Sequence, residues 1–282
     1  MLKALKQARA ALSMLNPEEM RRRAARDLHV GLVAVTESGY NLLEDFLVPA
    51  DLPGSVRAER LRHVHRATDS DVPSQVDFVL YEPGLKAHAE AFTLDRHTPE
   101  ETIAAILESK EEIAVALARN FPVFRRTVID RAIQTVAREN TLFAIATALP
   151  DVLPSFVELP WAFGEFASDT VFLTANQVRL AFLIAAASGC EVGFAEQKAA
   201  VGTIVAAAFG WRALARELVG KIPLGGGLIP KGAIAFAGTF AVGKALEHAY
   251  TDQPLTRHEH KTVYEQAYQR GLEFAKSLRR QA

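Results

Sequence analysis

The stretch 220–243, GKIPLGGGLIPKGAIAFAGTFAVG, constrains the fold of this chain more than any other segment. It contains seven glycines, no acidic residue and only two charged side chains, Lys221 and Lys231. Its central glycines and Pro230 predict a turn. After the turn, three alanines recur every fourth residue, at Ala233, Ala237 and Ala241.

Small residues at this spacing lie on one face of a helix and allow it to pack closely against a neighbour. The segment therefore predicts a hairpin that is buried, either in a helical core or against lipid. It carries no catalytic group.

The composition allows a sizeable core, but the charge is unevenly distributed. The chain has 282 residues, of which 49% are hydrophobic, so it has room for one large domain or two ordinary ones. Residues 1–26 carry seven basic and two acidic side chains, and residues 251–282 carry six and four. Basic ends around an acidic, apolar body fit an anionic surface better than nucleic acid. The alternative is that these charges simply lie on solvated helix faces.

Residues 2–15 predict a basic amphipathic helix, and Lys3, Lys6 and Arg9 are its candidate contacts to a membrane or partner. This N-terminal segment lacks the features of a signal peptide. No charge-free apolar run reaches the roughly 18 residues expected of a spanning helix. A re-entrant hairpin, with Lys221 and Lys231 reaching the headgroups, stays open as an alternative. With Cys190 as its single cysteine, the chain is expected in the cytoplasm, either free or peripheral or re-entrant at the inner membrane.

The first half has the pattern of a small α/β domain. Residues 28–35 and 76–81 predict buried strands, 89–94 a third strand, and 49–75 a long connection. Thr98 and Glu101 form a capping-box pattern that starts a helix. Residues 113–117 fit either a fourth strand or a continued helix, and we favour the strand.

From Pro122 onward the pattern is helical. Helices are predicted over the ranges 123–147, 173–188, 194–219, 230–250 and 256–280. The expected fold is α+β and mostly α. Residues 1–26 form basic helices, 27–120 a small degenerate P-loop-like α/β domain, and 121–282 an all-helical hydrophobic domain that ends in a polar helix.

The residues after the first strand match a phosphate-binding loop poorly. That loop reads G-x-x-x-x-G-K-[ST], in which backbone amides hold phosphate, the lysine neutralises charge and the hydroxyl binds Mg²⁺. Here the aligned residues are AVTESGYN, 34–41. Gly39 is in register, whereas Ala34, Tyr40 and Asn41 replace the first glycine, the lysine and the hydroxyl. We therefore expect a vestigial loop that binds no nucleotide and needs no cofactor.

The second strand ends in Tyr81-Glu82-Pro83-Gly84, where a GTPase has D-T-P-G. Tyr81 replaces the metal-side aspartate, and Gly84 keeps the glycine. With the loop at 34–41, this half resembles a worn-down Era- or dynamin-like GTPase domain. The alternative is an unrelated small α/β domain, and neither predicts nucleotide hydrolysis.

The second half carries several short motifs at separate places. They are Arg138-Glu139-Asn140, Ala148-Leu149-Pro150, Leu173-Thr174-Ala175-Asn176-Gln177, Phe209–Leu218, Ile222-Pro223 and Lys231-Gly232-Ala233-Ile234. Through these motifs, residues 123–250 resemble the YcjF-like family of bacterial proteins of unknown function. The resemblance implies a hydrophobic helical domain that also occurs behind GTPase domains, and membrane association. It supplies no catalytic residue.

Other patterns exclude common site types. His63-x-His65 and His258-x-His260 lack the H-E-x-x-H spacing, so we expect surface histidines and no metal site. Asn176, Gln177 and Arg179 interrupt an apolar helix and require buried partners.

The sequence thus predicts a non-enzymatic scaffold that docks on the inner membrane or on a protein partner. The alternative is a soluble interaction or homo-oligomerisation module in which the 220–243 hairpin is core. A GTPase-like protein with unusual ligands is less favoured.

Overall fold

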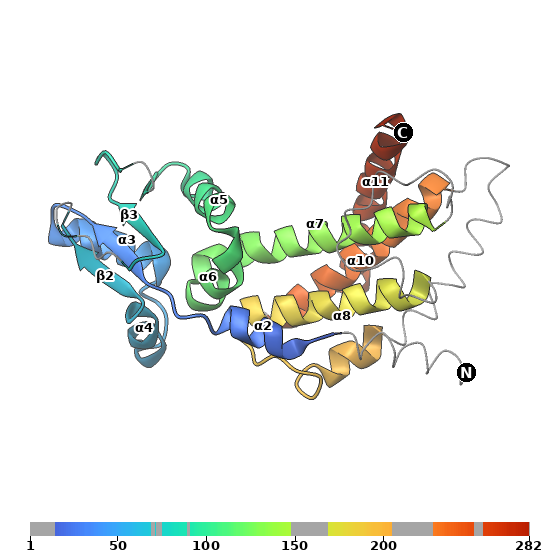
Figure 1. Ribbon diagram of the computed structural model, residues 1–282, viewed down its shortest axis with the longest axis horizontal. Coiled ribbons are helices and arrows are strands. Elements are labelled where there is room, and N and C mark those ends of the chain that lie inside the picture. Colours follow the sequence, from blue (N-terminus) through green and yellow to red (C-terminus); the bar gives the residue numbers. More distant parts are fainter. Residues whose placement is uncertain are drawn as a thin grey trace. The chain divides into compact units, whose positions relative to one another are not determined.

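The computed structural model describes residues 15–68, 71, 75–88, 91–147, 169–204, 228–250 and 256–281 (Figure 1). The fold is mostly helical, with one small parallel sheet. The chain divides into two compact units. The α/β unit comprises Glu19–Asp130 together with Ala186–Glu191, and the helical unit comprises Met1–Glu18, Arg131–Ala185 and Val192–Ala282. The division lies inside a continuous helix, past the Pro122 at which the sequence pattern changes.

The elements of the α/β unit are short and follow one another closely. Along the chain they are α2 (Pro17–Ala24), β1 (Val30–Val33), α3 (Glu37–Leu47), α4 (Gly54–Leu61), β2 (Val64–Ala67), β3 (Phe78–Tyr81), β4 (Phe92–Thr93), α5 (Pro99–Ser109), a 3₁₀ turn (Glu111–Ile113), α6 (Ala114–Asn120) and the start of α7 (Pro122–Ala146). The last strand is only two residues long.

The four strands are parallel and lie in the order β2-β1-β3-β4. Val30 pairs with Phe78 and Val33 with Tyr81. Because side chains alternate along a strand, Val30, Leu32, Phe78 and Leu80 share one face of the sheet, and all four are buried. On the other face Val33, Ala67 and Tyr81 form a cluster with residues of the segment that follows β3. The sheet is therefore packed on both sides, as apolar parallel strands require.

Three expectations for this half are wrong. The range 49–75 is not a long connection, because it contains α4 and the edge strand β2, whose sequence VHRA is too polar to read as a buried strand. Residues 113–117 are helical rather than a strand. The Thr98 side chain makes no cap; instead the Asp95 carboxylate accepts hydrogen bonds from the backbone N–H groups of His97 and Thr98.

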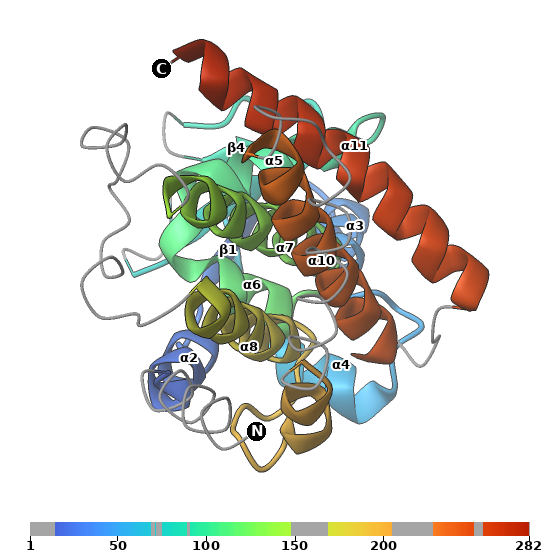
Figure 2. The ribbon, with the colours of Figure 1, turned by 90° about the vertical axis from the view of Figure 1, so that its right-hand side faces the viewer.

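Among the described residues, the helical unit contains four long helices, namely the greater part of α7, then α8 (Asp169–Ala187), α10 (Leu228–Tyr250) and α11 (Arg257–Gln281). Residues 198–204 are also helical, so this helix begins four residues after the predicted start at 194. In Figure 2 helix α10 lies between α7 and α11. The stacked rings of Phe143 and Phe172, 3.9 Å apart at their centroids, join α7 to α8.

Glycines bring α10 into close contact with its two neighbours. A Cβ at Gly232 would lie 2.9 Å from Ile145 Cδ1, and one at Gly243 would lie 2.6 Å from Ile133 Cγ1, both on α7. On the opposite side, Gly271 of α11 faces Ala233 and Phe236. The small residues of α10 thus set the spacing of three helices, as the 220–243 pattern predicts for a core helix. The glycine turn of that pattern and Lys221 lie outside the described residues.

None of the helices in the described ranges is both long enough and apolar enough to cross a bilayer.

Candidate functional site

The loop after β1 is closed by the side chain of the residue that follows β3. In open parallel sheets, ligands bind at the carboxyl ends of the strands, where the chain order reverses. Here that point lies between β1 and β3, because β1 is followed by β2 on one side and β3 on the other. Glu82 follows β3, and its Oε1 accepts a hydrogen bond of 2.8 Å from the backbone N–H of Val35.

The same carboxylate lies over the first turn of α3. A Cβ added at Gly39 would overlap Glu82 Oε2, so only glycine leaves space for the carboxylate there. Thr36 caps the helix by accepting the N–H of Gly39 at 3.1 Å. The N-terminus of a helix favours negative charge. Glu82 therefore places its carboxylate at the N-terminus of α3, where a helix favours an anion.

The other candidate residues of the loop at 34–41 make contacts that stabilise the fold. Ala34 is buried behind β1, and the Tyr40 hydroxyl donates to the carbonyl of Ala67 at 2.8 Å. Asn41 Oδ1 accepts a hydrogen bond from Arg66 Nη2 at 3.1 Å. Helix α3 starts at Glu37, so Gly39, Tyr40 and Asn41 are all helical.

The cation beside this loop is already neutralised. The Arg66 guanidinium contacts Glu37 and Glu44 at 2.6 Å each and lies over the ring of Tyr40, 5.2 Å from its centroid. These two carboxylates raise the pKa of Arg66, so its charge is permanent and locally paired. Arg66 therefore does not supply the free positive charge that a phosphate-binding lysine supplies.

The two residues of the second vestigial motif have separate structural roles. Tyr81 is buried at the end of β3, with its ring edge-on to His88. Gly84 has φ +90°, a conformation that favours glycine in the turn after Glu82.

A buried polar cluster crosses the apolar interior of the helical unit. Asn140 of α7 donates to Thr239 of α10 at 2.7 Å and accepts from Asn176 of α8 at 2.9 Å. Asn140 and Asn176 are both fully buried. Arg179 of α8 pairs with Glu139 of α7, which gives Arg179 the partner that the sequence required. The cluster fixes the register of α7, α8 and α10, because a shift of one helix would leave these groups unpaired.

We expect the Glu139→Gln substitution to change how stability depends on pH. Burial raises the pKa of Glu139 above 4.5, and the opposing effects of Arg179 and Asn176 are smaller. The folded state then holds this proton more tightly than the unfolded state. The resulting stabilisation is complete below the unfolded pKa and is lost as the pH rises through the folded pKa. The stability of wild type relative to Glu139→Gln should therefore fall as the pH rises above the unfolded-state pKa of about 4.3.

Urea unfolding at several pH values measures this difference. Glu273→Gln, at an exposed site on α11, is the matched control and should show no such trend. A difference for Glu139→Gln that stays constant or grows with pH would contradict the expected sign.

Some of the candidate membrane or partner contacts lie in the helical unit, and the others are residues that the structure does not describe. Ala233 and Ala237 are fully buried within the helical unit, and Ala241 is half-buried. Lys231 donates to the Thr147 hydroxyl at 3.3 Å. Lys3, Lys6, Arg9 and Lys221 lie outside the described residues. Ala233 and Ala237 thus lie in a packing surface inside this unit.

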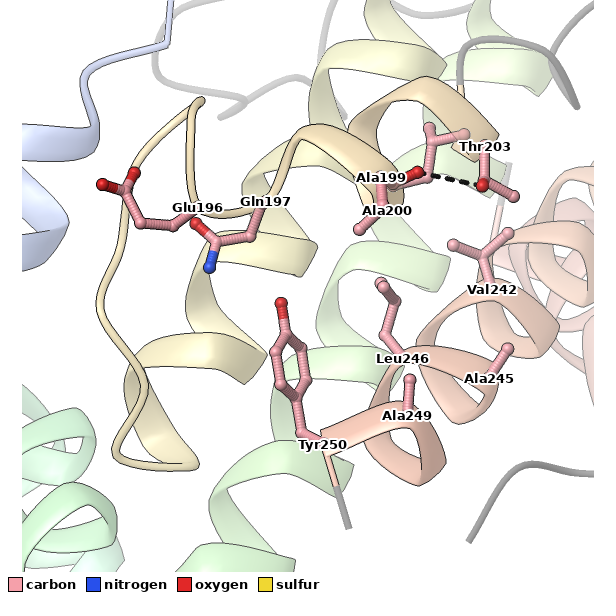
Figure 3. A pocket seen from close by; sticks show the side chains of 11 residues that line it. Glu196, Gln197, Ala199, Ala200, Thr203, Val242, Ala245, Leu246, Ala249 and Tyr250 are labelled. Atoms are coloured by element: carbon pink, nitrogen blue, oxygen red, sulfur yellow. Dashed lines mark hydrogen bonds between the residues drawn. The ribbon is translucent and has the colours of Figure 1, made fainter. Parts of the chain in front are cut away.

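A cavity of about 440 Å³ lies between the 196–204 segment and the C-terminal half of α10 (Figure 3). Its walls are mainly apolar, from residues such as Ala200, Leu246 and Ala249. The Thr203 hydroxyl is engaged by the carbonyl of Ala199 in its own helix. This arrangement offers volume but few polar groups to orient a ligand.

The two histidine pairs differ in their exposure to solvent. His258 and His260 are exposed, as expected, but His63 and His65 are partly buried. His29 Nδ1 and His65 Nε2 are 2.9 Å apart. His63 Nδ1 lies 3.3 Å from the Asp27 carboxylate. Within the described ranges, no group of three or more His, Cys, Asp or Glu side chains is arranged to hold a metal ion.

Sequence patterns did not single out Glu82 as a ligand for the loop, nor the arginines Arg60 and Arg125 of the α/β unit. Glu82 was visible only as part of the Pro-Gly turn, and its contact with Val35 depends on the pairing of β1 with β3. No signal in a single sequence shows that two distant arginines each keep a buried nitrogen without a hydrogen-bond partner in the described part of the chain.

No family model matches the chain, and neither a curated protein nor a solved structure is significantly similar to it. The resemblance of residues 123–250 to the YcjF-like family, and of the first half to a GTPase domain, therefore stays a hypothesis.

Proposed function

We propose that this chain is a non-enzymatic interaction protein that docks a partner protein and has lost nucleotide binding. The α/β unit keeps a parallel sheet with a strand–loop–helix at its centre, but it fills the ligand position with its own carboxylate. The helical unit provides a packed scaffold in which α10 is a core helix.

The observation that carries this proposal is the position of Glu82. Its carboxylate accepts the Val35 N–H and lies against Gly39 at the N-terminus of α3. A nucleotide phosphate at the same place would meet a like charge. The residues that would supply a lysine and a magnesium-binding hydroxyl are Tyr40 and Asn41, and both are engaged elsewhere.

Burial of Ala233 and Ala237 supports docking on a protein rather than insertion of this helix into lipid. The basic N-terminal segment 1–26 supports the other source of contact, an anionic membrane surface. A cytoplasmic location fits both.

Nucleotide binding is the direct test. We expect no saturable change in fluorescence when the full chain is titrated with a fluorescent GTP analogue in the presence of Mg²⁺. We also expect Glu82→Gln to lower the free energy of unfolding by about 1–2 kcal/mol, since it removes a charged acceptor from a helix N-terminus.

Glu108→Gln, at an exposed position on α5, is the control and should leave stability unchanged. Saturable binding by the wild type that unlabelled GTP displaces would contradict the proposal.

A further inference from the structure

Two arginines of the α/β unit carry buried nitrogens that have no hydrogen-bond partner among the described residues. Arg60 lies in the last turn of α4, and Arg125 lies in the first turns of α7. Within the described residues, Arg60 Nη1 and Arg125 Nη2 are buried and have no hydrogen-bond partner. The two guanidinium groups are near enough for Arg60 to act electrostatically on Arg125.

Arg125 contacts backbone dipoles, and the nearby Cys190 thiol raises its pKa by less than burial and Arg60 lower it. Arg125 Nε donates to the carbonyl of Ala187 at 3.1 Å, and its Nη2 lies 3.9 Å from the position of a Cβ at Gly189. The Oγ of Ser188, between these two residues, is also buried without a partner in the described structure. A hydroxyl and a guanidinium group thus lie at the same turn with unused hydrogen-bonding capacity.

Two carboxylates of the described residues, Glu191 and Glu59, lie near these cations in the chain. Arg119 of α6 donates to the carbonyl of Cys190 at 2.8 Å and lies 3.4 Å from Glu191. Glu191 is thereby directed to Arg119, and it is 77% exposed. Glu59, next to Arg60 in sequence, raises the pKa of Arg60 less than burial lowers it.

Arginine cannot relieve this cost by losing its proton. Burial lowers the pKa of Arg125, and repulsion by Arg60 adds to the effect. Even so, an arginine side chain stays charged near neutral pH. A lysine or histidine in this place could become neutral, whereas a pair of arginines stays charged and would be stabilised by a bound anion.

We infer that Arg60, Arg125 and Ser188 form a binding site for a tetrahedral oxyanion of the phosphate class. Two guanidinium groups match the charge of a phosphate dianion, and their planar donor geometry fits its oxygens. The Ser188 hydroxyl adds a donor from a third element. Both arginines are only half-buried, so a small ion reaches them after modest rotation of the side-chain ends. The ligand is either free inorganic phosphate or the phosphoryl group of a small phosphomonoester.

Thermal unfolding of the full chain tests this site in buffer free of phosphate and at constant ionic strength. Inorganic phosphate should raise the Tm in a saturable manner, while added chloride should not. Glycerol phosphate replaces inorganic phosphate in a second series, which distinguishes the phosphomonoester from the free ion. Acetate in a third series should have a much smaller effect, because it is a planar monoanion.

The variants give a distinctive expected pattern. Arg125→Met and Arg60→Met should each raise the Tm in the absence of phosphate, because each removes one of two repelling cations. Each should also weaken the apparent affinity for phosphate by at least about tenfold. Arg126→Met is the matched control, since Arg126 is the exposed neighbour on the same helix, and it should keep the wild-type response.

A wild-type Tm that rises no more with phosphate than with chloride would overturn the site, as would an Arg125→Met variant with a full phosphate response. An equal response to acetate would overturn the tetrahedral ligand. Isothermal titration of the wild type with inorganic phosphate keeps the test decisive if either variant fails to fold, because absence of binding there refutes the site directly.

Discussion

The Ala237→Glu variant is expected to lose the cooperative folding of the helical unit. Ala237 has no exposed surface, and its helix α10 is closely packed against both α7 and α11. A glutamate here would bury an ionised carboxylate without a partner, at a cost of about 3–5 kcal/mol or more. Because a domain of this kind is stable by only about 5–15 kcal/mol, the loss is a large share of the total.

Chemical denaturation followed by circular dichroism measures this loss. Ala249→Glu is the matched control, because Ala249 lies on the same helix and is exposed; it should unfold like the wild type. A different outcome would support lipid contact instead. In that case the wild type would float with anionic liposomes, and Ala237→Glu would unfold normally but lose that flotation.

The sequence allowed the helical unit to be predicted closely because its elements are long and periodic. The range 230–250 corresponds to α10 at Leu228–Tyr250, and 256–280 to α11 at Arg257–Gln281. Elements of this length average over many side chains, so a single misleading residue does not change the assignment. What the periodicity could not decide is whether the Ala233 stripe faces protein or lipid, since both favour small residues.

The α/β unit was harder to predict because its elements are short. Strand β2 has four residues, two of them His65 and Arg66, and its polar composition hides a strand whose Ala67 end is buried. The run at 113–117 is apolar throughout, and in a segment this short strand and helix have the same pattern. Tertiary context decides such segments.

The candidate site was predictable in outline and not in its decisive contact. Gly39 and the Pro-Gly turn locate the vestigial loop, and the structure shows both close to the ends of β1 and β3. The closing contact joins residues 35 and 82. It depends on which strands are neighbours and in what register, which is information that local sequence patterns do not contain.

The Gly271→Val variant is expected to separate α11 from α10. A Cβ at position 271 would lie 2.8 Å from Phe236 Cβ and 3.0 Å from both the Cα and the carbonyl oxygen of Ala233. Two of these three atoms belong to the backbone of α10, so no side-chain rotation relieves the overlap. The helices must move apart instead, and we expect a loss of about 2–3 kcal/mol in the free energy of unfolding, despite the better helix propensity of valine.

The loss should appear first as a weaker attachment of α11. Its contacts with α10 include the pair Phe236–Phe274, at 6.4 Å between centroids, and Arg270 over Phe240 at 5.6 Å, and both depend on the close approach at Gly271. Hydrogen exchange of α11 amides should therefore speed up in Gly271→Val more than exchange in α7. Gly202→Val is the matched control, because no atom of the described residues lies within 4 Å of a Cβ at that position. Unchanged exchange and stability in Gly271→Val would mean that α11 is not held by this contact, and the packing role assigned to the small residues of α10 would then be wrong.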